Sequence, residues 1–268
     1  MGTRFILLIV LAVLAICGPA RAGIKIDGFL THEKIVRPGD VHRGLIAISN
    51  TGSAPVEVKV YRTDYSFSAD GRNDYGDPGK LERSNAGWVH LNQEQVTIPP
   101  HEAVNVHYEL QVPADQTLDG TYWSMVMVEP VAAREAAIAP RSKEVRAQLT
   151  PVMRYGIQIV THLGDGGTGE LVFKNPQLRN ENGERLFTVD VENIGQRWLR
   201  PQLWLELAEA NGRPVGRLNA QAQRIYPATS VRYRIGLGAL PAGRYHALIV
   251  ADGGSDELFG TRIELAVK

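Results

Sequence analysis

The chain has 268 residues with 29 basic and 29 acidic side chains, one cysteine and 44% hydrophobic residues. This balance of charge gives no support to binding of nucleic acid or of an anionic membrane, both of which call for a strongly basic surface. No P-loop, no G-x-S-x-G motif and no H-E-x-x-H motif occurs, so the sequence favours a protein that is not an enzyme.

The first 22 residues have the pattern of an export signal. Arg4 precedes an apolar run over residues 5–16, and Ala20-Arg21-Ala22 matches a small-residue cleavage site. The single cysteine, Cys17, lies inside this segment and follows a bulky isoleucine, where a lipoprotein site would need a small side chain. We therefore expect an exported chain with no disulfide and no lipid anchor, and a cysteine-free exported protein fits the bacterial periplasm.

Removal of this segment sets the size and charge of what remains. Loss of Arg4 and Arg21 leaves 27 basic against 29 acidic residues, a net charge near −2. The other 246 of the 268 residues suit two domains of about 120 residues each. We predict a first domain over residues 23–160 and a second over 161–268, with the glycine-rich residues 164–169 as the linker. No second apolar run is long enough to span a membrane.

Short apolar stretches separated by turn residues run through the first half. Strands are expected near residues 45–48, 56–60, 88–91, 104–112 and 122–128, between turns that contain Pro, Gly and Asn. No stretch has a sustained helical period. The first domain is therefore predicted to be all-β.

Residues 64–86 interrupt this pattern as a polar insertion. It contains Asp70, Asp74 and Asp77, and closely spaced carboxylates are candidate ligands for Ca²⁺. The distal glutamate of the usual calcium-binding loop is missing, so a plain cluster of turn residues is the preferred interpretation.

The stretch over residues 145–161, VRAQLTPVMRYGIQIVT, predicts one long strand with an apolar row at odd positions. At about seventeen residues it is roughly three times the usual strand length. Pro151 cannot donate a ladder hydrogen bond, which indicates an unpaired edge or a bend. An open edge invites another strand, so this stretch is either a binding edge or an ordinary interior strand.

The second half repeats the plan of the first. Asn193-Ile194-Gly195 ends a strand as Asn50-Thr51-Gly52 does, and Pro227 is followed by apolar residues at the same offsets as Pro100. Two copies of one unit, the first carrying the insertion, explain this match. About seven short alternating strands in each unit predict two immunoglobulin-like β-sandwich domains in tandem. The seven histidines are scattered without metal-ligand spacing and are interpreted as surface or capping residues.

Three stretches of the sequence resemble the PapD-like periplasmic chaperones of pilus assembly. Residues 34–38 leading to 45–50 look like the family's first two strands, with Lys34 where the family has Arg. Pro113-Ala114-Asp115 followed by Trp123 and Pro130 looks like the F strand, and residues 151–159 occupy the place of the G strand. The resemblance covers most of the first domain and is architectural in the second.

This resemblance implies a non-enzymatic periplasmic chaperone or assembly factor that binds a secreted or pilus-type subunit by β-strand addition, without a cofactor. We expect Leu149, Met153 and Ile157, on the odd-numbered face, to contact the partner. The resemblance further implies that Lys34 and Arg154 grip the partner's C-terminal carboxylate.

A second interpretation stays open. Residues 96–100 with Val112-Pro113 and Gly120 are similar to the WxL-interacting proteins of Gram-positive surfaces. The alternative function is therefore a surface-associated structural or ligand-binding adaptor for a glycan or a folded protein.

Overall fold

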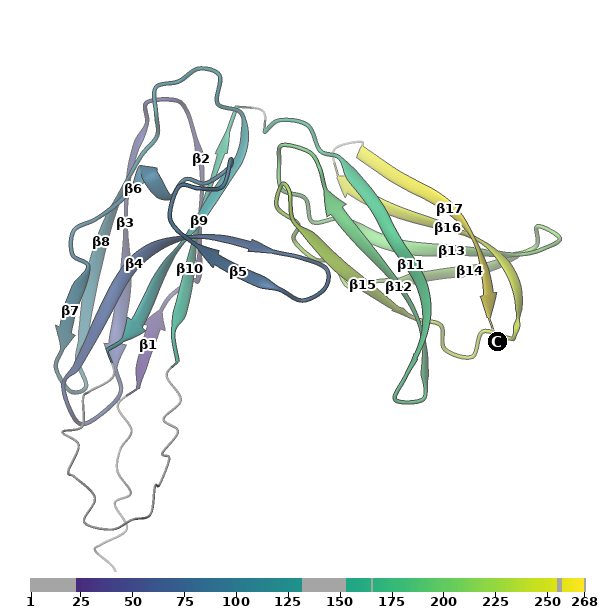
Figure 1. The fold of residues 1–268 in the computed structure, drawn as a ribbon, viewed down its shortest axis with the longest axis horizontal. Coiled ribbons are helices and arrows are strands. Elements are labelled where there is room, and N and C mark those ends of the chain that lie inside the picture. The colour runs from purple at the N-terminus through teal and green to yellow at the C-terminus, as the bar shows by residue number, and fades with distance from the viewer. Residues whose placement is uncertain (1–22, 132–152, 165, 255–256, 268) are drawn as a thin grey trace, which may run out of the picture.

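The computed structural model describes residues 23–131, 153–164, 166–254 and 257–267. Within these ranges the chain is almost entirely β, and its single helix is the 3-10 turn η1 (Ala86–Trp88). Two sandwiches lie end to end at an angle (Figure 1). The all-β, two-sandwich prediction is confirmed. Among the described residues no helix is long and apolar enough to cross a membrane.

Two sheets form the first domain. One has the order β1-β3-β8-β6, and the other has the order β2-β10-β9-β4-β5 with β7 paired to β4. All pairs are antiparallel except β2 with β10, which is parallel. The strands are β1 (Ile24–Asp27), β2 (Thr31–Val36), β3 (Val41–Asn50), β4 (Val56–Phe67), β5 (Asn73–Gly76), β6 (Val89–Leu91), β7 (Gln95–Ile98), β8 (Ala103–Gln111), β9 (Gly120–Pro130) and β10 (Tyr155–Leu163).

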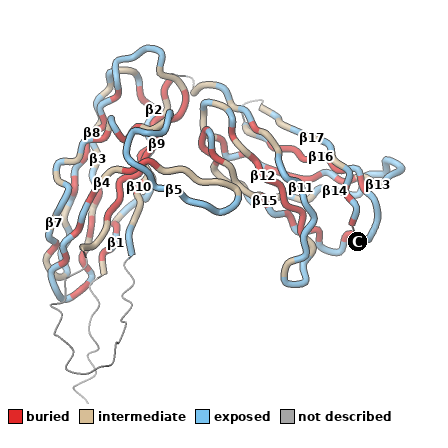
Figure 2. The backbone as a smooth tube through the Cα atoms, viewed as in Figure 1, coloured by how far each residue is buried: buried red, intermediate tan, exposed pale blue. Residues whose placement is uncertain are grey.

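The second domain has a three-stranded sheet of order β11-β12-β15 and a four-stranded sheet of order β14-β13-β16-β17. Each of the two domains has an apolar core of its own between its sheets, which Figure 2 shows as red strands inside pale blue loops. The strands are β11 (Leu171–Glu181), β12 (Glu184–Asn193), β13 (Gln202–Glu209), β14 (Pro214–Asn219), β15 (Ser230–Gly236), β16 (Gly243–Gly254) and β17 (Glu257–Val267).

The internal repeat is visible as one turn built twice. The amide of Asn50 donates to the carbonyls of Ala54 and Ile98, and that of Asn193 donates to the carbonyls of Arg197 and Ile225. In both turns the side-chain oxygen accepts the N–H of the glycine two residues on. The residues after the matched prolines, His101 and Ala228, also share a left-handed φ of 58°. The predicted relationship between the two units therefore extends to individual hydrogen bonds.

The inserted residues form a hairpin. β4 continues to Phe67 and turns back as β5, and the buried carboxylate of Asp64 accepts the N–H groups of Gly79, Lys80 and Leu81 at 2.9, 2.7 and 2.7 Å. Asp64 therefore holds the rest of the insertion against the sheet, because it satisfies backbone donors that would otherwise lack partners.

The calcium hypothesis for Asp70, Asp74 and Asp77 finds no support in this hairpin. Within the described ranges no three acidic or histidine side chains are grouped closely enough to hold a metal ion. Asp70 instead accepts hydrogen bonds from Ser68 and Arg72 inside the turn. Its carboxylate stabilises the hairpin tip.

The last strand of the first domain differs from its predicted limits. β10 begins at Tyr155 and runs to Leu163, whose side chain is fully buried in the first core. The expected domain boundary after residue 160 therefore falls inside this strand. The upstream part of the predicted long strand, residues 145–152, lies outside the described residues.

Candidate functional site: an open strand edge beside the interdomain joint

The two sides of β10 are paired to different extents. β9 pairs with β10 along its whole length, from Tyr155 to Leu163, whereas β2 pairs only from Gln158 onward. The N–H of Gln158 donates to the carbonyl of Leu30 at 2.8 Å, so even-numbered residues direct their backbone groups toward the β2 side. Gly156 has the same parity and has no strand beside it on that side among the described residues. Its N–H and C=O are therefore available to an added strand.

β2 continues this open edge. It pairs with β10 and with no other described strand, so its outer backbone groups are unpaired as well. Exposed apolar side chains surround this edge: Phe29 is 84% exposed, Ile35 81% and Met153 68%. Large apolar side chains at such exposure, next to unpaired strand edges, mark an interaction surface.

The three residues that we expected to contact a partner lie in different surroundings. Met153 is exposed just before β10, and Leu149 lies outside the described residues. Ile157 is fully buried in the core of the first domain. The apolar row of β10 therefore faces the domain's own second sheet, and from Tyr155 onward it is the backbone edge that stays open.

Lys34 and Arg154 do not form the expected anchor. Lys34 lies beside Thr161 in the parallel register, so Arg154, seven residues before Thr161, is about 23 Å away at a rise of about 3.3 Å per residue. The two side chains also belong to opposite faces of the sheet, because alternate residues point to opposite sides. The Arg154 guanidinium lies 5.2 Å from the ring centroid of Tyr75. A single carboxylate cannot contact both cations.

An aromatic cluster joins the two domains. Tyr226, from the second domain, stacks on Trp123 of β9 with ring centroids 4.9 Å apart and an interplanar angle of 14°. The ring of Phe67 in the hairpin meets the Tyr226 ring edge-on, with the ring centroids 6.2 Å apart. Tyr226 is 1% exposed, and burial raises the pKa of its hydroxyl. Its hydroxyl donates to the side-chain oxygen of Gln158 in β10 at 3.0 Å.

Polar side chains of β2 and β10 also contact the second domain, and together with the aromatic cluster they form the joint between the domains. Glu33 of β2 lies between His162 of β10, at 2.7 Å, and Arg224 of the second domain, at 3.3 Å. The Arg224 guanidinium lies over the Trp198 ring, 4.1 Å from its centroid. Trp198 places its indole nitrogen 3.1 Å from the imidazole of His162. The open edge and the joint therefore share the same two strands.

The inserted hairpin adds a second contact between the domains. The N–H of Ala69 at its tip donates to the hydroxyl of Ser230 at 3.0 Å. Phe67 and Ala69 therefore connect the insertion to Tyr226 and to the start of β15. The insertion therefore braces the second domain.

The residues of the joint were missed from the sequence, although one signal for them exists. Tyr226 stands where the first unit has Pro99, so a large aromatic residue departs from the repeat at the point where the domains meet. Trp123 was noted only as part of the resemblance. Phe29 and Ile35 were not singled out, because isolated apolar residues on a surface are common.

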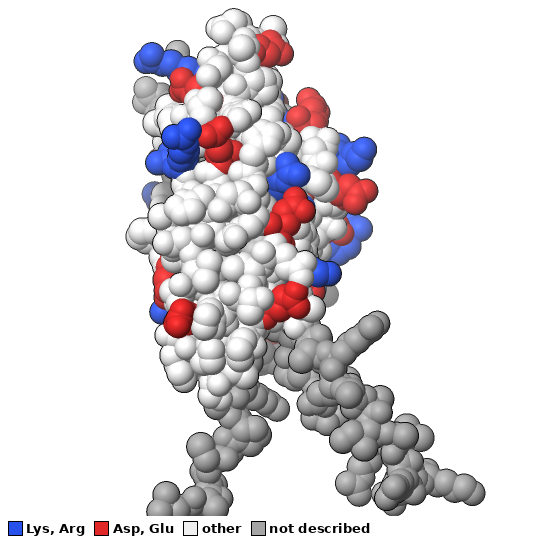
Figure 3. All heavy atoms as spheres, turned by 90° about the vertical axis from the view of Figure 1, so that its left-hand side faces the viewer, with Lys and Arg blue, Asp and Glu red and all other residues white. Residues whose placement is uncertain are grey.

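Charge of one sign is not concentrated on the face that Figure 3 shows. The face in Figure 3 carries acidic and basic side chains interspersed, without a large patch of one sign. This agrees with the balanced composition.

No protein-family model and no curated protein matches the chain. Solved structures that resemble it over most of its length include a chain of the chaperone–tip adhesin complex of CFA/I fimbriae biogenesis, at 12% identity and a TM-score of 0.49, covering 92% of this chain and 100% of that one. Another belongs to the CsuC–CsuE chaperone–tip adhesion subunit complex of Acinetobacter baumannii, at 13% identity and a TM-score of 0.43, covering 93% and 100%. A third belongs to the Salmonella enterica SafA pilin in complex with the SafB chaperone, at 11% identity and a TM-score of 0.40, covering 90% and 96%. At these identities and TM-scores, function has to be argued from the site itself.

Proposed function

We propose that this chain is a non-enzymatic chaperone that holds a secreted protein subunit by accepting one of its strands at the open edge of β10 and β2. The observation that carries the proposal is the unpaired edge at Gly156, beside the unpaired outer side of β2. A strand placed there extends the sheet and satisfies backbone groups on both partners.

The side chains around the edge support an apolar partner. Phe29, Ile35 and Met153 expose most of their surface, and covering them would contribute about 25 cal/mol for each Å² removed from water. A folded soluble protein rarely presents a matching row of apolar side chains, whereas an incompletely folded subunit does. The chemistry of the edge therefore suits a subunit that still lacks part of its own sheet.

The joint supports this role by keeping the edge in one geometry. β10 supplies Gln158 and His162 to the contacts with Tyr226 and Trp198 of the second domain, so the strand next to the open edge is held from both domains. A binding edge that is already ordered loses less conformational entropy when the partner arrives.

The expected export signal and the resemblance to PapD-like chaperones support a periplasmic location and a pilus-type or other surface subunit as the partner. The proposed function needs no catalytic group, because strand addition uses backbone donors and acceptors and apolar side chains.

The test begins with capture of the tagged chain from the periplasm and identification of the protein that comes with it. We expect the paired variant Phe29→Glu, Met153→Glu to lose that partner while remaining folded. Val215→Glu is the matched control, since Val215 is a partly exposed apolar residue of the second domain.

Hydrogen exchange on the purified complex then locates the contact. Strand addition to β10 predicts slower exchange at the amide of Gly156, because the added strand would lie in line with β2. Slower exchange along the outer edge of β2 would instead place the strand beside β2. A folded partner that binds without slowing those amides would instead support the adaptor function. Capture that is undiminished in the paired glutamate variant would exclude this edge as the binding site.

A further inference from the structure

The C-terminal strand β17 is a long sheet edge that lacks proline and has a register shift only at its start. It pairs with β16 along its length, and no strand among the described residues pairs with its other side. Proteins usually interrupt such edges with proline, bulges or short strands. The described part of β17 spans 11 residues and contains neither proline nor lysine.

The other edges of the second domain do carry such protection. β11 contains Pro176 and a register shift after Lys174, and β14 begins at Pro214 and has a shift in its pairing with β13. β15 carries Arg232 and Arg234 at alternate positions of one face, which would place like charges opposite one another if two copies paired about residue 233. The β16–β17 ladder has a register shift as well, but it lies at the start of β17, between Asp252 and Gly254 of β16. From Leu258 to Val267 the described ladder is uninterrupted.

The outward side chains of β17 complement themselves. Residues 258, 260, 262, 264 and 266 share one face, and they are Leu, Gly, Arg, Glu and Ala. In an antiparallel pair of two β17 strands centred on Ile263, Arg262 of each copy lies opposite Glu264 of the other. Gly260 of each copy likewise lies opposite Ala266 of the other, so a pair of small residues lies on either side of the two ion pairs. Opposite charges directly across an antiparallel pair are stabilising.

We propose that β17 is a self-association edge, where a second copy of this chain adds its own β17 antiparallel about a two-fold axis at Ile263. About nine residues of each copy then oppose one another, which joins the two four-stranded sheets into one continuous sheet. The occupant is a second copy because the charge pattern is complementary to itself in this register.

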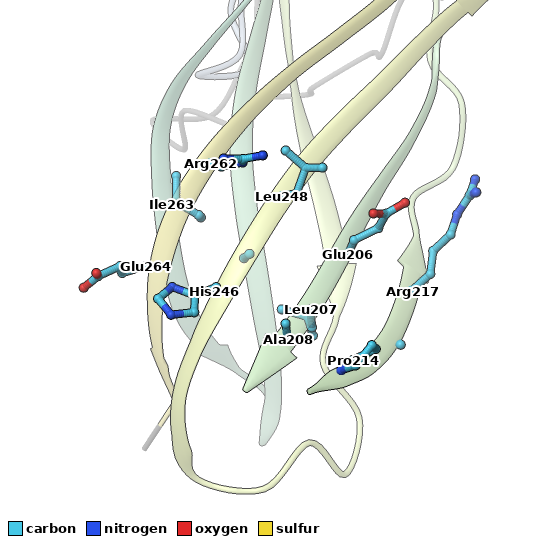
Figure 4. A pocket seen from close by; sticks show the side chains of 12 residues that line it. Glu206, Leu207, Ala208, Pro214, Arg217, His246, Leu248, Arg262, Ile263 and Glu264 are labelled. Atoms are coloured by element: carbon cyan, nitrogen blue, oxygen red, sulfur yellow. The ribbon is translucent and has the colours of Figure 1, made fainter. Parts of the chain in front are cut away.

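The side chains concerned are available. Within the described part of the chain, Arg262 and Glu264 form no ion pair, and both are exposed. Both lie at a groove of about 850 Å³ on the outer face of the sheet, and Figure 4 shows Glu264 directed away from the neighbouring strand β16. Pairing across β17 would continue this face into the second copy.

Charge reversal tests both the edge and the register. In sedimentation velocity over a range of concentrations, the wild-type chain should dimerise, and Arg262→Glu or Glu264→Arg alone should weaken the dimer by about tenfold or more, because two attractive pairs become repulsive. The double variant Arg262→Glu, Glu264→Arg should restore the dimer. An equimolar mixture of the two single variants should form a heterodimer, since one copy then presents two glutamates to two arginines.

Three results would overturn the proposal: a wild-type chain that stays monomeric at several hundred micromolar, a dimer that all variants form equally well, or single variants whose mixture fails to associate. The substituted side chains are exposed, and circular dichroism checks that each variant is folded. The edge lies on the second domain, away from β2 and the open end of β10, so these variants should still capture the subunit. Failure of self-association is therefore distinguishable from failure of the proposed chaperone function.

Discussion

Replacing Tyr226 by alanine should uncouple the two domains. The ring is 1% exposed, stacks on Trp123 and meets Phe67 edge-on. Truncating a buried aromatic side chain costs about 3 to 5 kcal/mol, and loss of an aromatic pair accounts for about 0.5 to 1.5 kcal/mol beyond the area that it buries. We therefore expect the free energy of unfolding to fall by about 4 kcal/mol. The lost contacts belong to the interface between the domains, so both domain cores should stay intact.

Urea unfolding followed by tryptophan fluorescence and by far-ultraviolet circular dichroism measures this loss. In the wild-type chain the joint should make the two domains unfold together, so the two signals should coincide. In Tyr226→Ala the fluorescence of Trp123 and Trp198 should change at lower urea than the circular dichroism. Small-angle X-ray scattering should show a broader range of interdomain angles.

Tyr226→Phe is the matched control. It keeps the ring and its stacking and loses the hydrogen bonds of the hydroxyl with Gln158 and Arg224, which should cost about 1 kcal/mol and leave the transitions coincident. If Tyr226→Ala loses less than about 1 kcal/mol and its scattering profile is unchanged, the aromatic cluster does not hold the domains, and the argument for a prearranged binding edge fails with it.

Four further substitutions test the fold. Asn50→Ala and Asn193→Ala should each cost about 3 kcal/mol in urea unfolding, because each removes the side-chain hydrogen bonds that close a buried turn, and similar losses would support the structural repeat. Burial raises the pKa of Tyr233 to about 12. The unfolded chain releases that proton near pH 10 while the folded chain keeps it, so stability should fall as pH rises from about 10 to 12, and Tyr233→Phe should reduce this slope. The hydrogen bond from Arg232 lowers the pKa of Asp190. Its stabilising contribution is complete above the ordinary carboxyl pKa and is lost as pH falls through the lowered value, so Asp190→Asn should flatten the acid limb of stability measured by thermal unfolding.

The fold could be predicted because its signals are local. Alternation of apolar and polar residues depends on neighbours two positions apart, and turns depend on Pro, Gly and Asn at particular places. The match between Asn50 and Asn193 was available from the sequence for the same reason. Its physical basis, a side-chain amide that closes the same turn in both domains, became visible only in the structure.

The candidate site was harder to predict because it depends on pairing between distant segments. Whether Lys34 lies near Arg154 depends on the register of β2 against β10, which more than a hundred residues separate in the chain. Local patterns do not specify that register, and a shift of one residue also reverses the face of every side chain. The anchor was therefore assigned by resemblance, and the parallel pairing of Lys34 with Thr161 places the two charges apart.

Ile157 shows why an alternating pattern alone does not distinguish a core strand from a binding strand. Both kinds of strand need a continuous apolar row, because each row packs against something, either the domain's own second sheet or a partner. The two kinds of strand differ in whether both backbone edges are hydrogen-bonded to neighbouring strands. In β10 the row at Ile157 is buried while Gly156, one residue earlier, faces an unpaired side. The binding function is therefore better sought in the ladder of hydrogen bonds than in the hydrophobic pattern, and the amide of Gly156 is the group whose exchange rate a bound strand should change most.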